Sequence, residues 1–531
     1  MKKGRTILGG VVVLTLAGVL VKITGVVYKI PLTYLLGDEG MGYFNAAYTV
    51  YSWLYMLSTA GFPVALSILV SDSVAKGAFD VVRSTIRKAG MLLVSIGILG
   101  SVGMLVFAPQ LAALVGAQRA APAIRAIAPA LIFICITSLF RGVFQGYQCM
   151  GPTAISQIVE ACGKVALGLG FAYVAASRGY ALDTIAAYAI FGVTVGTVLG
   201  TIYLVVRYLV AVKRDELSLR HQTKTVEAKK GILRRIVGIS IPVTIGASVM
   251  ALTTLIDLVM MIRRLQNIGY SAAEATAIYG NYTALVVPMF NLPSILITPI
   301  ASGIIPAISA MRASNNILQR NMLLGNTYRV VSAISIPCAF GLCFLSRPIL
   351  GLLYPASSAE NAYRLLSAVS PAVTLLALLT VSNAVLQAMG RQRLSMWGMA
   401  IGSATKIGIG YLLLGIPGVA ALGAPIGTVA CYLFALAFSL ASLSKTIGYT
   451  FSFWDLIGKP SLASLAGIGT ATFVYQELFF AWGRFLGIFA AILLSVLLYG
   501  LCAAALGVFS FADFQPILSA IKRKRSTVRE V

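Results

Sequence analysis

The sequence has few of the residues from which catalytic sites are built. Its 531 residues include one histidine, and only 11% of them are charged. One histidine, His221, cannot supply a histidine metal cluster within a single chain. The seven cysteines lie in or beside apolar segments without metal-ligand spacing, which is typical of small core residues. We therefore expect a protein that is not an enzyme and that has no metal site and no cofactor.

Low charge is matched by long apolar runs. Hydrophobic residues make up 59% of the chain, and a soluble protein of this length would need roughly twice the charge to cover its surface. Apolar segments of about 20 residues recur from end to end, which is the pattern of a membrane protein with many helices. No loop between these segments is long enough for a soluble catalytic domain. The sequence predicts an all-α polytopic membrane protein.

Fourteen segments are expected to form transmembrane helices. The segments are roughly 7–30, 43–70, 88–108, 124–148, 154–177, 184–210, 232–262, 278–310, 327–346, 362–389, 394–415, 419–443, 461–481 and 485–509.

The basic residues indicate the orientation of the chain. Lys and Arg number 41 against 16 Asp and Glu, for a net charge of +25. They gather in alternate loops and at both termini, so the positive-inside rule places both termini in the cytoplasm, which fits an even number of helices. Because the bases are spread over short loops, we expect contact with anionic membrane lipids and not with nucleic acid.

Pairs of similar segments at one offset indicate an internal duplication. "APAL" resembles "SPAV", "FQGYQ" resembles "LQAMG", and "GKVALGLG" resembles "TKIGIGYL", each pair being 242 residues apart. This offset also relates Lys22 to Arg264. We expect two six-helix lobes related by a pseudo-twofold axis along the membrane normal, followed by two further helices. The domains would be an N-terminal lobe at 1–212, a cytoplasmic linker at 213–235, a C-terminal lobe at 236–445, and the last two helices with a basic tail at 446–531.

Several charged residues lie inside predicted membrane helices, where a charge is costly. Lys22 and Lys29 are seven residues apart and therefore share one helix face. Lys29 could reach the outer interface, whereas Lys22 lies deeper and is expected to face water. Glu160 and Lys164 have the spacing of an i,i+4 ion pair.

Two further intramembrane charges are candidates for function. Lys406, the counterpart of Lys164 in the duplication, has Gly402 where an acidic partner would stand. Asp257 is expected to pair with a base or to bind H⁺ or Na⁺ as a coupling site. Arg264 could instead be an interfacial anchor together with Arg263.

Motifs along most of the chain resemble the multidrug/oligosaccharidyl-lipid/polysaccharide exporter superfamily. They are "GVVYKIPLTYLLGDEGMGYF", "GFPVALSILVSD", "FRGVFQGYQCMGPTAISQIVEACGK" and "LPSILITPIASGIIPAISA". The resemblance is greatest to the polysaccharide branch, which contains stage V sporulation protein B and lipid II flippases of the MurJ type. Gram-negative relatives have an Arg-Asp pair where this chain has Tyr28 and Lys29, so any cationic site must use other positions.

The resemblance implies two lobes around a cavity that opens alternately to either side of the membrane. It implies a flippase for a polyprenyl-diphosphate-linked oligosaccharide such as lipid II, acting as a monomer in the cytoplasmic membrane, with its last two helices forming a groove for the lipid tail. A cationic cavity would bind the diphosphate. The candidates for it are Lys22, Lys29, Arg264, Lys164 and Lys406.

The mechanism would require bending in the helices that line the cavity. The hinge candidates are Pro31, Pro63, Pro293 and Pro306. Energy coupling remains open among Na⁺, H⁺ and the membrane potential. Two other functions are considered: a MATE-like drug/cation antiporter, which would need more acidic than basic groups inside, and a non-transporting scaffold for envelope synthesis, which would need large partner-binding loops.

Overall fold

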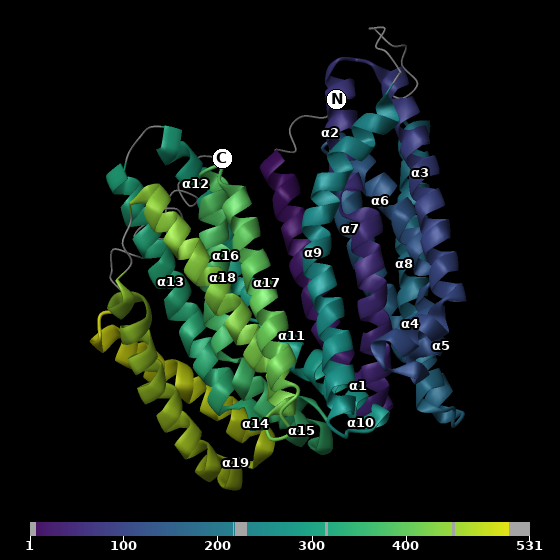
Figure 1. The fold of residues 1–531 in the computed structure, drawn as a ribbon. Helices are drawn as coiled ribbons and strands as arrows, with labels where there is room; N and C mark the ends of the chain where they lie inside the picture. Colours follow the sequence, from purple (N-terminus) through teal and green to yellow (C-terminus); the bar gives the residue numbers. More distant parts are fainter. Residues whose placement is uncertain (1–6, 216, 218–230, 314–316, 449–451, 509–531) are drawn as a thin grey trace. The chain divides into compact units, whose positions relative to one another are not determined.

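The computed structural model describes residues 7–215, 217, 231–313, 317–448 and 452–508. About 90% of the structure is helical, and these residues form no β-strand (Figure 1). The expected all-α class is thereby confirmed. Most of the predicted linker 213–235 and the basic tail after residue 508 lie outside the described residues.

Eight helices of the described chain are long and apolar enough to cross a membrane, and the number rises to ten if two bent pairs each form one span. The predicted count of fourteen and the two six-helix lobes remain predictions. One reason the counts differ is that single helices contain two predicted spans. Helix α1 (Ile7–Thr59) covers the first predicted span and much of the second, and α19 (Lys459–Ala505) covers the last two.

Both long helices are interrupted by a glycine. Gly37 in α1 has φ 61° and ψ −171°, and Gly483 in α19 has φ 76° and ψ 170°. Backbone with these angles is nearly restricted to glycine and breaks the helical path. Each long helix therefore consists of two segments that meet at a sharp change of direction, as Figure 1 shows for α19.

The chain forms two compact units, Met1–Ala284 and Leu285–Val531. The first unit extends beyond the predicted N-terminal lobe at 1–212 and includes α9 (Ile232–Asn267) and α10 (Ala272–Asn281). The predicted boundaries at 212 and 235 remain predictions. After α1, the helices of the first unit are α2 (Phe62–Ala75), α3 (Phe79–Val106), α4 (Ala108–Val115), α5 (Ala121–Ile127), α6 (Ala130–Gly146), α7 (Met150–Ser177), α8 (Leu182–Lys213), α9 (Ile232–Asn267) and α10 (Ala272–Asn281).

The second unit is also a helical bundle. Its core lies among α12, α13, α16 and α18, where the Tyr328 hydroxyl shares a 2.7 Å hydrogen bond with Ser382. A π-helical turn, Tyr282–Val286, links the two units and contains their boundary. The helices that follow this turn are α11 (Val287–Asn291), α12 (Ser294–Ala313), α13 (Ile317–Phe344), α14 (Ser346–Leu353), α15 (Ala356–Val369), α16 (Pro371–Ala388), α17 (Gln392–Leu413), α18 (Gly423–Ile447) and α19.

Close approach of α7 and α8 positions the polar residues of the first unit. On α8, Gly192 and Gly196 lie one turn apart and face α7. A Cβ atom on Gly192 would lie 2.2 Å from the Gly168 Cα atom, and one on Gly196 would lie 2.6 Å from the Lys164 backbone nitrogen. Small residues allow membrane helices to pack backbone against backbone. We call Gly168, Gly192 and Gly196 the glycine seam. The close packing at this seam fixes the position of the part of α7 that contains Lys164.

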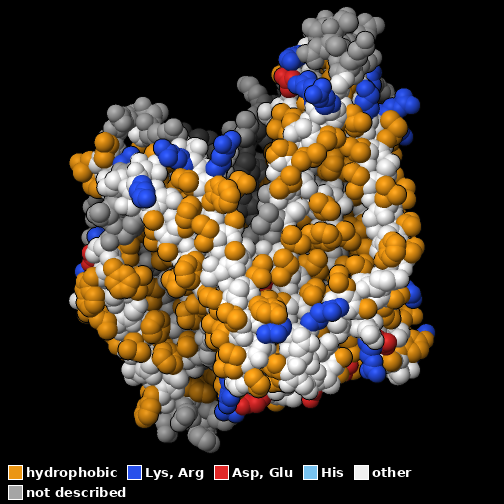
Figure 2. Space-filling model, viewed as in Figure 1, with side chains coloured by type: hydrophobic (Ala, Val, Ile, Leu, Met, Phe, Trp, Pro, Cys, Tyr) orange, Lys and Arg blue, Asp and Glu red, His pale blue; other side chains and the backbone are white. Residues whose placement is uncertain are grey.

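Charged residues of the first unit lie mainly near its helix ends. Asp72 in α2 accepts a 3.1 Å bond from Lys76 and lies 3.9 Å from Arg235 at the start of α9, so these helix ends share one side of the unit. On the face shown in Figure 2, hydrophobic side chains cover most of the length between the ends. This distribution is the one expected for helices in a bilayer.

Candidate functional site

A cavity of about 700 Å³ lies inside the first unit. Residues from both segments of α1, together with α6, α7 and α8, form its wall. Its charged residues are Lys22, Arg141, Glu160 and Lys164. Four tyrosines of α1, together with Thr24, Ser52 and Gln157, complete the polar part. The structure thus brings together two of the five predicted cationic residues, Lys22 and Lys164. With three bases and one acid, the cavity carries a formal excess of positive charge.

Lys164 lies against aromatic rings. Its ammonium nitrogen is 4.6 Å from the centre of the Tyr48 ring and 5.7 Å from that of Tyr28. The negative face of an aromatic ring attracts a cation without neutralising it. The rings therefore hold the ammonium group in place and leave its charge available to a ligand.

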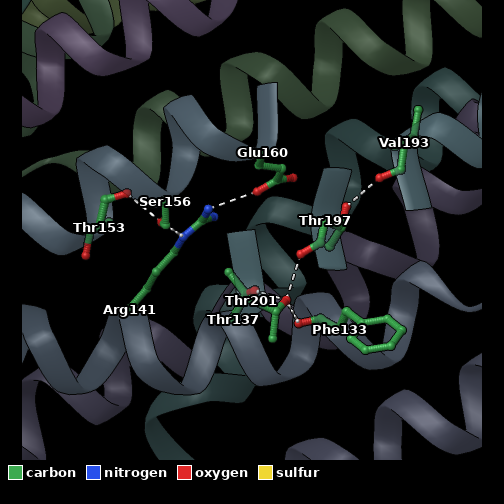
Figure 3. A network of polar contacts seen from close by, with 9 residues as sticks. All are labelled: Phe133, Thr137, Arg141, Thr153, Ser156, Glu160, Val193, Thr197 and Thr201. Carbon is green, nitrogen blue, oxygen red and sulfur yellow. Dashed lines mark hydrogen bonds and ion pairs between the residues drawn. The ribbon is translucent and has the colours of Figure 1, made fainter. Parts of the chain in front are cut away.

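Arg141, and not Lys164, is the partner of Glu160. A guanidinium nitrogen of Arg141 donates to a Glu160 carboxylate oxygen at 2.9 Å, and Nε donates to the Ser156 hydroxyl at 3.1 Å. Figure 3 shows Arg141 reaching from α6 to both residues on α7. These side chains are only 13% and 28% exposed, respectively, so the ion pair is screened less than a surface pair. Because Arg141 neutralises Glu160, the excess charge of the cavity comes from the two lysines.

A second polar cluster holds α8 against α6 beside the cavity. The Thr137 and Thr201 hydroxyls share a 2.8 Å hydrogen bond between α6 and α8, and Thr201 is also 3.1 Å from the Phe133 carbonyl oxygen (Figure 3). Hydroxyl groups that bond across helices in this way keep their polar atoms satisfied inside apolar surroundings. The cluster joins α6 to α8 close to Arg141.

Lys22 and Lys164 have no acidic partner among the residues that the structure describes. Within the described ranges, no carboxylate oxygen is within 4.0 Å of either ammonium nitrogen, and neither side chain donates a hydrogen bond to the protein. Lys22 is exposed at the cavity wall. An ammonium group in a membrane helix needs water, an acid or an anionic ligand. The cavity leaves room for the last of these.

Lys29 has a different environment, although it shares a helix face with Lys22. Its ammonium group donates a 2.7 Å hydrogen bond to the carbonyl oxygen of Thr283, in the π-helical turn. In a π-helix this carbonyl would accept from the residue five positions ahead, which is Pro288, and proline has no N–H. Lys29 thus supplies the donor that the helix cannot.

Replacing Lys29 with Met should destabilise the protein by about 1.5–3 kcal/mol, because it leaves the Thr283 carbonyl without a donor. Changing Pro288 to Ala restores an N–H at the required position, so the loss should be smaller in a Pro288→Ala background. Thermal unfolding of the purified single and double variants measures this coupling. Equal losses in both backgrounds would show that Lys29 does not replace the missing N–H.

The other predicted charges lie elsewhere. Arg264 is in the last turn of α9 and is not among the described residues that line this cavity. Its neighbour Arg263 donates to the carbonyl oxygens of Leu114 and Ala113 at 2.7 and 2.8 Å, at the end of α4. Asp257 lies two turns earlier in α9, and Lys406 lies in α17 of the second unit. Among the described residues, Arg264 therefore does not line the cavity that contains Lys22.

The four hinge candidates lie at helix breaks or inside helices. Pro31 lies within α1, and Pro63 follows the break between α1 and α2. Pro293 lies in the turn between α11 and α12, where the helical path bends by 48°. Pro306 is within α12. Their role as hinges remains a prediction.

Sequence reasoning missed Arg141 and the tyrosines of α1. Arg141 stands in the motif "FRGVFQGYQ", inside a predicted membrane helix, so its position alone was a signal. Tyr48, Tyr51 and Tyr55 repeat at the spacing of one helix face, which could have indicated an aromatic wall. No group of three or more His, Cys, Asp or Glu side chains in the described part of the chain could hold a metal ion.

The chain is similar in sequence and in fold to known membrane proteins. The chain is 26% identical to the lipid II flippase MurJ of Bacillus subtilis (strain 168) over 84% of each chain, and 24% identical to stage V sporulation protein B of the same organism over 83% of this chain and 84% of that protein. A solved lipid II flippase MurJ in an inward closed conformation matches with a TM-score of 0.69 at 15% identity, over 93% of this chain and 98% of the other. An inward-facing multidrug transporter of the MATE family matches with a TM-score of 0.67 at 14% identity, over 81% and 94%.

These matches confirm the expected resemblance to the exporter superfamily and its polysaccharide branch. Together with its apolar helices, they identify an integral protein of the bacterial membrane. The side on which the termini lie remains a prediction. Residues 7–312, more than half of the chain, match the model of a family described as polysaccharide biosynthesis protein. The chain belongs to the polysaccharide biosynthesis protein family.

Proposed function

We propose that the protein is a flippase that moves a polyprenyl-diphosphate-linked oligosaccharide, such as lipid II, across the cytoplasmic membrane by alternating access. One observation supports this most strongly: Lys22 and Lys164 face a cavity of the first unit, with no acidic partner among the described residues. A diphosphate carries several negative charges and acceptor oxygens, so two ammonium groups that line one cavity suit it. No bond of the substrate is made or broken.

A second cavity, in the other unit, suits the lipid tail. It has a volume of about 580 Å³ and lies among α12, α13 and α19, with Pro337, Ile468 and Val496 in its wall. Its wall is almost entirely apolar, so a polyprenyl chain could occupy it without burying a polar group.

The charge of the first cavity argues against the main alternative. A drug/cation antiporter would need acidic groups to attract a lipophilic cation, whereas this cavity has three bases and one acid, and the acid is paired with Arg141. The fold itself does not separate the two functions, because the flippase and the multidrug transporter match it about equally well.

Depletion of the protein from growing cells tests the proposal. Radiolabelled lipid-linked oligosaccharide should accumulate in the inner leaflet and become less accessible to an enzyme added from outside. Re-expression of the wild-type chain should restore outer-leaflet labelling. If the distribution between leaflets is unchanged in depleted cells that lack related flippases, the protein does not carry this substrate.

A further inference from the structure

Aromatic rings form a continuous row along the cavity. Phe44, Tyr48, Tyr51 and Tyr55 follow one another on one face of the second segment of α1, at spacings of four, three and four residues. Tyr28 from the first segment extends the row. The centroids of successive rings, from Tyr28 to Tyr55, are 6.1, 6.3, 6.1 and 6.0 Å apart.

The two ends of the row differ in what they offer a ligand. Tyr28 forms one end, where its hydroxyl donates to the Ala189 carbonyl oxygen at 3.3 Å, and Lys164 lies between this ring and the middle ring, Tyr48. At the other end, Tyr55 is half-buried and lines the cavity together with Ser52 and Gln157. The Tyr55 end therefore combines a ring with a hydroxyl and an amide group that can both donate and accept.

We propose that Tyr55 and Tyr51, with Ser52 and Gln157, form the subsite for the sugar rings of the substrate. This inference rests on the proposed function and adds to it a specificity-determining residue, Tyr55. The C–H groups on one face of a pyranose carry partial positive charge, and they stack on the negative face of an aromatic ring. The sugar hydroxyls need donors and acceptors at the edge of that stack, which Ser52 and Gln157 provide.

The position of the lysines is compatible with a sugar subsite at Tyr55 and a diphosphate bound elsewhere in the same cavity. Lys22 and Lys164 belong to the same cavity as Tyr55, so one ligand can contact the rings and an ammonium group together. The volume of about 700 Å³ lies within the range that holds a small ligand, roughly 300–1,000 Å³. A diphosphate with one or two sugar rings is of this size, whereas a long polyprenyl chain would leave the polar groups without partners.

Aromatic rings also attract organic cations, but the basic residues of this cavity would repel an organic cation. Arg141 lies 2.9 Å from Glu160, and Tyr55 lines the same cavity as this pair. A lipophilic cation at Tyr55 would meet Arg141, Lys22 and Lys164 with only one, already paired, carboxylate to stabilise it. A neutral sugar linked to an anionic group has no such conflict.

The test compares two probes on the full-length protein in lipid nanodiscs. One is undecaprenyl diphosphate, and the other is undecaprenyl diphosphate linked to a disaccharide. Tyr55→Leu should raise the Kd of the disaccharide-linked probe about tenfold and that of the sugar-free probe less than about twofold, because only the ring stack is lost. Tyr55→Phe keeps the ring and should bind both probes nearly as the wild type does. Gln157→Ala should weaken only the disaccharide-linked probe, by severalfold.

Two controls separate this inference from the proposed function. Tyr173→Leu removes a ring from the exposed side of α7 and should change neither Kd. Lys22→Gln should weaken both probes; if it weakens neither, the proposed function fails. If Lys22→Gln weakens both but Tyr55→Leu affects the two probes equally, or neither, the sugar subsite is wrong. Displacement of the disaccharide-linked probe by tetraphenylphosphonium, lost in Tyr55→Leu, would assign the rings to a cation and also overturn it.

Discussion

Replacing Lys22 and Lys164 together with Gln is expected to reduce transport by at least about 100-fold. Each ammonium group can make a charge-assisted hydrogen bond to a diphosphate worth about 1.5–3 kcal/mol, and two of them together give a factor of about 150 or more. The single variants should retain part of the activity. Growth of a flippase-depleted strain that expresses each variant, together with the leaflet distribution of the labelled lipid, measures the effect.

The control for this prediction is Arg87→Gln. Arg87 is an exposed base of α3 that does not line the cavity, so its loss removes the same charge from another place. It should grow like the wild type. Normal growth of the double lysine variant at wild-type expression would remove the cationic cavity from the mechanism, whereas failure of both variants would indicate a general effect of charge on insertion.

Gly192→Val is expected to prevent stable folding of the first unit. The new Cβ atom would lie 2.2 Å from the Gly168 Cα atom and 2.3 Å from its nitrogen, and a backbone cannot move aside as a side chain can. Overpacking a well-packed site typically costs about 1–3 kcal/mol, and a contact between backbones should cost about 3 kcal/mol or more. The expected result is a strongly lowered melting temperature of the detergent-solubilised protein and poor expression.

Gly170→Val is the matched control. Gly170 is an exposed residue of α7, and a Cβ atom there would meet nothing within 4 Å. The same change of residue should therefore leave the melting temperature near that of the wild type, or raise it slightly because valine has less freedom in the unfolded chain. Equal destabilisation by both substitutions would mean that the glycine seam between α7 and α8 is not tightly packed.

The sequence was sufficient to predict the fold class and part of the site. Apolar runs predicted a helical membrane protein, and the cost of a charge in a bilayer singled out Lys22 and Lys164 as functional candidates. What periodicity cannot show is which residues of other helices lie nearby. The i,i+4 spacing suggested an ion pair between Glu160 and Lys164. In the structure, Arg141 of α6 pairs with Glu160, and Lys164 lies over the Tyr48 ring of α1.

Lys29 illustrates the same limit within one helix. Seven residues place Lys22 and Lys29 on one face, yet only Lys22 lines the cavity. The environment of Lys29 depends on a π-helical turn 254 residues later in the chain and on a proline that removes one N–H from it. A pattern read along one helix contains no information about such a distant irregularity.

The continuity of α1 and α19 was difficult to predict for a physical reason. Predicted spans were separated by a polar turn, but α1 and α19 each contain two spans joined by a single glycine with positive φ. A glycine in an apolar run is compatible with a continuous helix, a kink or a tight break. Only the backbone angles of the folded chain distinguish among these.

Equilibrium binding of undecaprenyl diphosphate to the purified protein in nanodiscs tests the central claim most directly. The account predicts saturable binding that inorganic pyrophosphate competes for and that the Lys22→Gln/Lys164→Gln variant loses, while Arg87→Gln binds like the wild type. Binding of the same strength in the double lysine variant, or no binding by the folded wild-type protein, would contradict it.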